Sequence, residues 1–380
     1  MPADSFLYFF GTVFNSGHQV TRGKGVAESR KPLIDISSSI QLLINVPANL
    51  EAYRRMVGVI RSKQSFAFAG AGVSRPLGYP TWLELLNRLA SETRTRCGED
   101  IIDGEGRPLT VTEVERIDDL LVQAEILKVN LKEQYGGLIR EIFARKRSIK
   151  VEIKELARLP FQHILTSNYD VSLEVAHEEL QLQCESICLC DGAAREFVNK
   201  LFDTNYGKRI VHVHGRFDKP ESIVLTEKEY AALYQGSQVV ERFWGAVPMY
   251  RTCVFLGFSF SDEEITESFN LRNFNRAHRE GSQTPHFALL ALADTDRDKE
   301  RVLRTGYAAK YGVDPVFFDP VDWKYSGYSN VIENIAQDIS PPVARGAVGQ
   351  GHSPSYADDF ARLEALTTLN MKKGATGELR

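Results

Sequence analysis

Cysteine is scarce in this sequence, and its distribution argues against two common uses of the thiol group. The chain has 380 residues but only five cysteines. An odd count without an export signal predicts reduced thiols in the cytoplasm, not a disulfide framework. Cys184, Cys188 and Cys190 cluster without the second pair that would complete four zinc ligands. We therefore expect no metal site and a cytoplasmic location.

Long apolar runs and a strong charge imbalance are also missing. No run is long enough to span a bilayer. The apolar residues 7–10 follow Asp4 and no basic residue, unlike a signal peptide. A net charge of −4 gives no electrostatic reason for the whole chain to bind nucleic acid. We expect no membrane contact, and contact with nucleic acid only through a partner.

Short apolar runs alternate with segments of helical periodicity along the chain. The composition, 43% hydrophobic and 25% charged, is that of a soluble globular protein. Strands are predicted at residues 66–69, 161–167, 210–214, 253–258, 287–292 and 316–318. The alternation predicts an α/β fold with a Rossmann-like parallel sheet and helices on both of its faces.

The chain divides into a central domain and two ends. Residues 49–340 are predicted to form the sheet domain, with a polar loop at 97–109 and an inserted helical module at about 112–157. Residues 1–48 form an extension that is a candidate subunit contact. Residues 341–380 have linker composition followed by a short amphipathic helix. That helix either docks on another chain, packs on its own domain or remains disordered.

The stretch 65–87 (SFAFAGAGVSRPLGYPTWLELLN) organises the central domain. It reads as a buried strand, a turn of small residues at 70–74 and a helix that starts at Thr81. Thr81 and Glu84 have the spacing of a capping box. This order brings backbone N–H groups to a phosphate in many α/β proteins. The full G-x-G-x-x-G pattern is absent because Arg75 takes its last position, so the turn alone also fits an ordinary tight turn.

Small and polar residues follow four of the predicted strands. They lie at 70–74, 168–170, 214–215 and 257–259. In a parallel sheet the carboxyl ends of the strands share one edge, and ligands bind there. The four stretches therefore predict a single site.

Taken together, these stretches resemble the sirtuin superfamily. The turn GAGVS at 70–74 resembles the GAGxS phosphate loop of that family, and Gly78-Tyr79-Pro80 resembles its GIP. TSNYD at 166–170 is similar to its TQNxD, and His214-Gly215 to its catalytic HG. GFS at 257–259 resembles the GTS that contacts a ribose. The match keeps the order of the family over roughly residues 65–319.

Two departures separate this chain from the sirtuin deacylases. The arginine of their DFR motif is replaced by Leu83, and their four-cysteine zinc ribbon is missing, since only Cys253 lies between His214 and Gly257. The sequence is instead similar to bacterial sirtuin-like NAD hydrolases of antiphage defence. Their T-[ST]-N-Y-D and FLGFSxSD motifs match residues 166–170 and 255–262, and Tyr230 follows the HG as it does there.

The resemblance implies hydrolysis of the bond between nicotinamide and ribose, with NAD+ as substrate and no metal. It implies that Asn168 positions the attacking water or the ribose, although a turn asparagine would look the same. Asp170 either orients a neighbouring group or caps a helix. The pyrophosphate is expected at Gly70, Ala71, Gly72 and Ser74, with further contacts from Pro80, Gly257 and Ser259.

His214 is the candidate general base, because its unperturbed pKa lies near neutrality and it stands beside Gly215 at a strand end. Period-two alternation places His212 on the same face, as a supporting or buried residue. His163 begins its strand at the opposite end and is interpreted as structural. Asp262, with Ser261, is interpreted as a helix cap.

The resemblance also implies a biological setting. Proteins of this branch deplete NAD in abortive infection and work with a HerA-type ATPase or a short Argonaute. Because few residues follow the core, we expect a separate partner, with the HerA-type ATPase first, and a homo-oligomer. The alternatives are a non-catalytic module that senses NAD or ADP-ribose and regulates a partner ATPase or nuclease, and a protein deacylase.

Overall fold

The structure of this protein is a computed structural model, and it describes most of residues 39–340. The residues described are 43–144, 148–260, 262, 265–267, 269, 286–322 and 326–339. Most of the predicted extension at 1–48 and all of the predicted tail at 341–380 lie outside this set.

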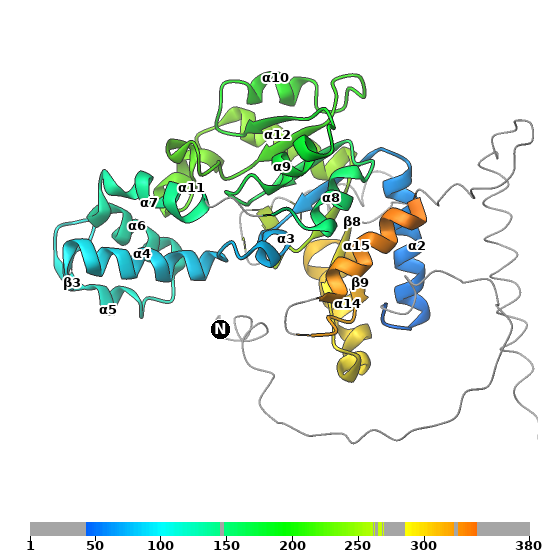
Figure 1. The fold of residues 1–380 in the computed structure, drawn as a ribbon, viewed down its shortest axis with the longest axis horizontal. Helices are drawn as coiled ribbons and strands as arrows, with labels where there is room; N and C mark the ends of the chain where they lie inside the picture. The colour runs from blue at the N-terminus through cyan, green and yellow to red at the C-terminus, as the bar shows by residue number, and fades with distance from the viewer. Residues whose placement is uncertain are drawn as a thin grey trace, which may run out of the picture. The chain divides into compact units, whose positions relative to one another are not determined.

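A parallel sheet of seven strands forms the centre of the described chain (Figure 1). Its order is β5-β6-β4-β1-β7-β8-β9, and each neighbouring pair is parallel. The strands are β1 (Ser65–Ala69), β4 (His163–Thr166), β5 (Glu185–Cys188), β6 (Arg209–His212), β7 (Thr252–Leu256), β8 (His286–Ala291) and β9 (Val313–Phe318). The predicted α/β class is confirmed. β6, β4, β1 and β7 are neighbours in that order, so all four predicted site stretches follow adjacent strands.

Both faces of the sheet are buried, and β1 shows why its sequence is almost entirely apolar. Phe66 and Phe68 pack into the core on one face, whereas Ala67 and Ala69 pack into the core on the other. A strand covered on both sides needs apolar residues at successive positions, not at alternate ones. This accounts for the continuous runs from which the strands were predicted.

Helices cover each face of the sheet (Figure 1). On the face of Ala67 lie α2 (Pro47–Arg61), α8 (Val151–Arg158), α9 (Ser172–Glu179) and α15 (Ser326–Ile339). On the face of Phe66 lie α10 (Ala194–Asn199), α11 (Glu227–Tyr234) and α12 (Gln238–Tyr250), while α14 (Glu300–Tyr311) packs on β9. None of the described helices is long and apolar enough to cross a membrane.

The chain between β1 and β4 is largely helical. After the short α3 (Ala71–Ser74) come α4 (Trp82–Cys97), α5 (Val111–Val114), α6 (Leu120–Leu131) and α7 (Gln134–Phe143). The capping box of α4 is confirmed: Glu84 N donates to Thr81 Oγ1 at 3.3 Å and Thr81 N donates to Glu84 Oε2 at 2.8 Å. Two otherwise unpaired amides at the helix start are satisfied in this way.

The polar loop predicted at 97–109 is in part an antiparallel hairpin, β2 (Asp100–Ile102) and β3 (Pro108–Thr110). The Asp103 carboxylate accepts hydrogen bonds from the amides of Glu105 and Arg107 at 2.9 and 2.8 Å. Gly106 takes a φ of 81° in the turn. Local side-chain bonds to the turn, not an apolar pattern, hold this hairpin together, and periodicity therefore missed it.

Three glycines allow the segments after β1 and β7 to meet backbone against backbone. Gly70 N donates to Leu256 O and Gly72 N to Gly257 O, each at 2.9 Å. A Cβ atom on Gly257, whose φ is 58°, would lie 2.5 Å from the nitrogen of Val73. A Cβ atom on Gly72 would lie 2.8 Å from the Gly257 Cα. Any side chain here would separate the two loops.

We expect Gly257→Ala to destabilise the protein by roughly 2 to 5 kcal/mol, since it combines a left-handed backbone with a steric overlap. Urea unfolding followed by circular dichroism measures the loss. The control is Gly58→Ala, because Gly58 lies on the exposed surface of α2 with open space around its Cβ position. That change should stabilise the protein by about 0.5 to 1 kcal/mol. Equal effects at the two positions would contradict the packing described above.

Candidate active site

The carboxyl edge of the sheet brings Asn168 against the glycine turn. Asn168 follows β4, and its Nδ2 donates to Gly70 O and to Ser74 Oγ, both at 3.0 Å. Thr166 Oγ1 donates to Ala69 O at 2.9 Å and accepts from Asn168 N at 3.1 Å. Because both amide hydrogens of Asn168 are engaged, its Oδ1 is the atom left to accept a hydrogen bond from a ligand.

The glycine turn itself is held by internal hydrogen bonds. Besides the two glycine amides that reach the loop after β7, Val73 N donates to Gly70 O at 3.0 Å. Ser74 is buried, and its Oγ lies 3.4 Å from the Ser172 Oγ at the start of α9. The predicted pyrophosphate residues are thus tied both to the loop after β7 and, through Asn168, to the loop after β4.

Asp170 is buried beneath this contact. Its Oδ1 accepts from Ser172 N at 3.0 Å, which anchors the start of α9. Burial raises the pKa of Asp170, although hydrogen bonds from Ser172 and Ser74 oppose the shift. The bond to Ser172 fits the capping alternative, and it also places a carboxyl group directly under Ser74.

His214 lies just beyond the end of β6 with its ring 3% exposed. Its Nε2 is 2.8 Å from the Tyr234 hydroxyl, and its Nδ1 is 3.4 Å from the Tyr230 hydroxyl. Tyr230 in turn donates to Asp262 Oδ2 at 2.9 Å. Burial lowers the pKa of His214, and the Asp262 carboxylate only partly offsets this effect. The imidazole is therefore neutral at physiological pH and able to accept a proton.

His212 contacts a different set of groups, which corrects the expectation that alternation continues to His214. Its Nδ1 lies 2.9 Å from Asn168 O and its Nε2 lies 2.7 Å from Glu174 Oε1. β6 ends at His212, so the strand period does not govern His214, which meets α11 instead of α9. His212 thus supports the Asn168 loop from below.

A turn at Gly215 sets the position of His214. Gly215 has a φ of 85°, and a Cβ atom there would lie 2.0 Å from Ser222 O. The chain folds back at this point, so that Val224 N donates to His214 O at 3.0 Å. This return carries the chain to Thr226, which begins α11 with a capping box to Glu229. The glycine beside the histidine is thus needed to bring the two tyrosines of α11 to its ring.

The remaining predicted residues lie around this edge in different settings. Pro80 is buried just before the cap of α4. Gly257 packs on the glycine turn, and Ser259 is exposed two residues further on. His163 is buried at the start of β4, with Nε2 at 3.1 Å from Leu201 O, and burial lowers its pKa to about 4. Its position at the opposite end of the strand agrees with a structural role.

Sequence reasoning missed the partners of His214. The sequence pattern gives no reason to select Tyr234, places Tyr230 only within a motif and predicts Asp262 as a cap. Asp262 does cap a helix, since Ile265 N donates to its Oδ1 at 3.0 Å, and its other oxygen accepts from Tyr230. The available signal was two tyrosines at i and i+4 behind a capping box, which places both on one helix face.

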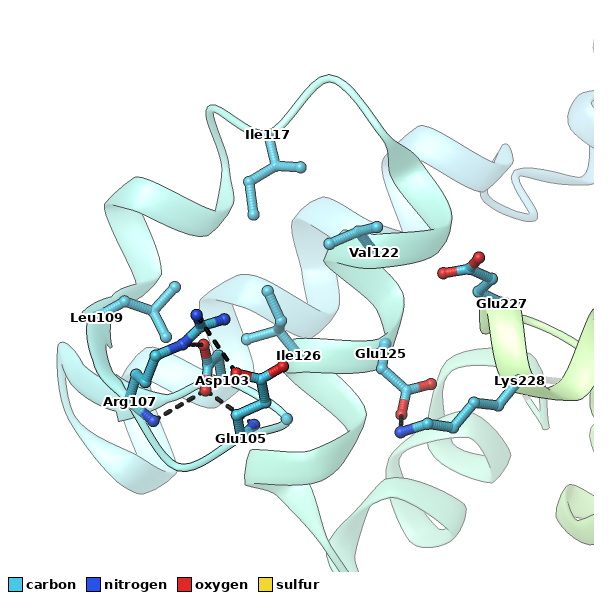
Figure 2. Close-up of a pocket in the computed structure, with 11 residues that line it drawn as sticks. Asp103, Glu105, Arg107, Leu109, Ile117, Val122, Glu125, Ile126, Glu227 and Lys228 are labelled. Carbon is cyan, nitrogen blue, oxygen red and sulfur yellow. Dashed lines mark hydrogen bonds and ion pairs between the residues drawn. The ribbon is translucent and has the colours of Figure 1, made fainter.

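A pocket of about 650 Å³ lies on the helical module, and none of the predicted site residues lines it (Figure 2). Apolar side chains line it together with three ion pairs: Arg107 to Asp103 at 2.6 Å, Arg107 to Glu105 at 3.3 Å and Lys228 to Glu125 at 2.5 Å. Four carboxylates line it against two cations, so the lining carries a net negative charge. Two of its lining residues, Glu227 and Lys228, begin the helix that carries Tyr230 and Tyr234.

Comparison with known proteins finds a sirtuin-like segment in the chain. Residues 162–316 match the family model of the SIR2-like domain, a range that includes Asn168, His214 and Gly257 but not the glycine turn. No group of three or more His, Cys, Asp or Glu side chains in the described part of the chain is placed to hold a metal ion.

Several curated proteins are similar to most of the chain. NAD(+) hydrolase ThsA from Bacillus cereus (strain MSX-D12) is 26% identical over 247 residues, which are 63% of this chain and 46% of that protein. ThsA from Acinetobacter baumannii (strain 532279) is 28% identical over 256 residues, 65% of this chain and 47% of that protein. Defense-associated sirtuin 2 from Bacillus subtilis is 24% identical over 225 residues, 58% of this chain and 20% of that protein. The chain spans about half the length of the ThsA proteins it matches, and the predicted resemblance is confirmed.

The buried pair of His212 and Glu174 should make stability depend on pH. Burial alone would lower the pKa of His212, but Glu174 outweighs it and the net shift is upward. Burial would raise the pKa of Glu174, yet His212 and its hydrogen bonds lower it to about 2. The His212 contribution is present below pH 6.5 and lost as the pH rises through its raised pKa. The Glu174 contribution is present above pH 4.5 and lost as the pH falls toward 2.

We therefore expect Glu174→Gln to cost about 2 to 4 kcal/mol near pH 6, as expected for a largely buried pair, and less at pH 9. Thermal unfolding at the two pH values gives the comparison. Glu185→Gln is the control, because Glu185 is 75% exposed in its pair with Arg209 and should change stability little. A loss from Glu174→Gln that did not vary with pH would refute the ion pair.

Proposed function

We propose that this chain, which carries a SIR2-like domain, hydrolyses NAD+ to nicotinamide and ADP-ribose. The observation that carries the proposal is the position of Asn168, whose amide joins the glycine turn after β1 to the loop above His212. A dinucleotide with its pyrophosphate on that turn would extend its nicotinamide ribose past Asn168. The similarity to proteins named NAD(+) hydrolase supports the same reaction.

The reaction places few demands on the protein. Nicotinamide leaves from a cationic nitrogen as a neutral molecule, and the ribose passes through an oxocarbenium-like state. Water adds to the anomeric carbon and loses a proton, so NAD+ and water give nicotinamide, ADP-ribose and H+. No acid is needed for the leaving group. The protein needs to hold the pyrophosphate, orient one water or ribose hydroxyl and provide a base.

We assign these tasks to the residues of the carboxyl edge. Asn168 Oδ1 orients the water or a ribose hydroxyl, while its Nδ2 remains bonded to Gly70 O and Ser74 Oγ. His214, neutral in its buried position, accepts the proton. The backbone of residues 70–74, with Pro80, Gly257 and Ser259 nearby, holds the remainder of the dinucleotide. Asp170 acts from beneath through Ser74 and Ser172.

We further propose that the activity serves antiphage defence in the cytoplasm by depleting NAD, within a homo-oligomer that is controlled by a partner. The partner we favour is a HerA-type ATPase, with a short Argonaute as the second choice. The name of one similar protein, defense-associated sirtuin 2, supports a role in defence, and thiols at Cys97, Cys184, Cys188 and Cys190 that form no disulfide fit a reducing compartment. The helical module is our candidate for the controlling contact, because α6 is joined to α11 by the ion pair of Lys128 and Glu229.

The direct test is nicotinamide release from NAD+ by the purified chain, alone and with the product of the neighbouring gene. We expect Asn168→Ala and His214→Ala each to reduce the rate by at least about a hundredfold, the usual effect of losing a positioned base or hydrogen-bonding group. Asn205→Ala is the control, since Asn205 is exposed and distant in sequence from the site stretches. Binding of NAD+ without release under any condition would favour the sensor alternative.

The pH dependence of the rate follows from the environment of His214. A base must be unprotonated, and burial lowers the pKa of this histidine. We therefore expect kcat/KM to remain high at neutral pH and to fall on the acid side with a midpoint below about 6.5, the ordinary pKa of histidine. An acid limb with a midpoint above that value would exclude His214 in this setting as the base.

A further inference from the structure

The ring of His214 is enclosed by two tyrosines from one turn of α11. Tyr234 contacts Nε2 at 2.8 Å, and Tyr230 contacts Nδ1 at 3.4 Å. The Nδ1 side continues to Asp262, whose Oδ2 lies 2.9 Å from the Tyr230 hydroxyl and 3.7 Å from Nδ1. Asp262 follows β7, so the chain of contacts joins the loops after β6 and β7 through α11.

Counting hydrogens along this chain determines the tautomer of His214. Tyr230 has a single hydroxyl hydrogen, and it is donated to the Asp262 carboxylate. Toward His214 the same oxygen can only accept, so Nδ1 must carry the ring proton. In a neutral imidazole Nε2 is then the acceptor, and the Tyr234 hydroxyl donates to it.

We propose that Tyr230 and Asp262 are positioning residues that hold the proton of His214 on Nδ1 and so keep Nε2 as the basic nitrogen. The use made of that nitrogen rests on the proposed function. The third member of a nucleophile–base–orienter arrangement usually contacts the histidine directly. Here a tyrosine hydroxyl stands between the carboxylate and the ring, which leaves the carboxylate free to cap a helix as well.

We call the contacts from Asp262 through Tyr230 to His214 the relay. Its residues are held by groups that cannot easily move. The Tyr230 ring stacks on Trp82 at 6.3 Å and on Tyr234 at 5.7 Å between ring centroids. The start of α11 is fixed by its capping box, in which Thr226 N donates to Glu229 Oε2 at 2.9 Å, and Leu225 N donates to the same oxygen at 2.9 Å. Asp262 is anchored by the amide of Ile265. Packing of this kind is what holds a base in its productive orientation.

The titratable groups that face His214 come from two elements. Tyr230 and Tyr234 belong to α11, and Asp262 lies in the segment after β7. Of these, Asp262 is the group that raises the pKa of His214, against the larger effect of burial. Removing its charge should therefore lower the pKa of the histidine further.

The 2.8 Å contact of Tyr234 marks the position from which Nε2 accepts a proton. A water or ribose hydroxyl must take that position or transfer its proton through the tyrosine oxygen. Tyr234 therefore lies on the reacting side of the ring, whereas Tyr230 lies on the orienting side. Substituting each tyrosine separately distinguishes the two sides.

The kinetic experiment compares Tyr230→Phe and Asp262→Asn with the wild-type full chain, in the presence of its partner if the partner is required. We expect kcat to fall about tenfold to a hundredfold with KM changed less than about twofold, because the base is misoriented but substrate contacts remain. Asp262→Asn keeps a capping oxygen and should move the acid limb of the pH profile to lower pH. Unchanged kcat and pH profile in both variants would overturn the relay.

Matched controls separate the relay from general damage. Tyr250→Phe removes a hydroxyl from a tyrosine that is 59% exposed, and Asp119→Asn removes the charge of another capping aspartate, at the start of α6. Both should leave kcat unchanged. If circular dichroism shows that Tyr230→Phe does not fold, the kinetic test of the proposal rests on Asp262→Asn alone.

A second measurement does not depend on activity. Chemical shifts in 15N-histidine-labelled protein distinguish a protonated from an unprotonated ring nitrogen, and the signals of His214 are identified by their loss in His214→Gln. We expect the proton on Nδ1 in the wild type and in Tyr234→Phe, and a mixed population in Tyr230→Phe. A proton on Nε2 in the wild type would overturn the proposal. If the chain released no nicotinamide, the proposed function would fail while these spectra still decided the relay.

Discussion

The backbone contact between the glycine turn and the loop after β7 is the constraint on which the site depends. Gly70 and Gly72 lie so close to Gly257 that no Cβ atom fits at any of the three positions. This contact fixes where the turn ends and leaves Gly70 O and Ser74 Oγ to receive the amide of Asn168. The loop after β4 is thereby joined to the turn, and His212 reaches the same loop from β6. The sequence predicts that these glycines allow a phosphate to approach the backbone of the turn. In the structure they allow the backbone of another loop to approach it.

Two histidines that stand two residues apart show how burial alone does not decide the protonation of a side chain. Both rings are almost fully buried. His212 faces the Glu174 carboxylate at 2.7 Å, and its pKa is raised. His214 faces two tyrosine hydroxyls, with the nearest carboxylate 3.7 Å away, and its pKa is lowered. A charged partner in contact overcomes the cost of burial, whereas neutral partners do not. The first histidine is suited to hold structure together and the second to accept a proton.

The sequence predicted the features that depend on local pattern. The buried strands follow from apolar runs, and the cap of α4 follows from Thr81 and Glu84. It missed β5, whose polar Glu185 and Ser186 interrupt the apolar pattern of an edge strand, and the hairpin around Asp103, which depends on side-chain bonds to a turn. It identified His214 by its place at a strand end. It could not identify Asp262 as a partner of that histidine, because 48 positions separate them and only the fold brings them within 3.7 Å.

A structure of Asn168→Ala with NAD+ bound would test the central claim most directly, since this variant should retain the dinucleotide without cleaving it. The account predicts the pyrophosphate against the turn at residues 70–74 and the nicotinamide ribose between position 168 and Nε2 of His214. A dinucleotide bound elsewhere, for example in the pocket on the helical module, would contradict it (Figure 2). So would a nicotinamide ribose that lay out of reach of His214.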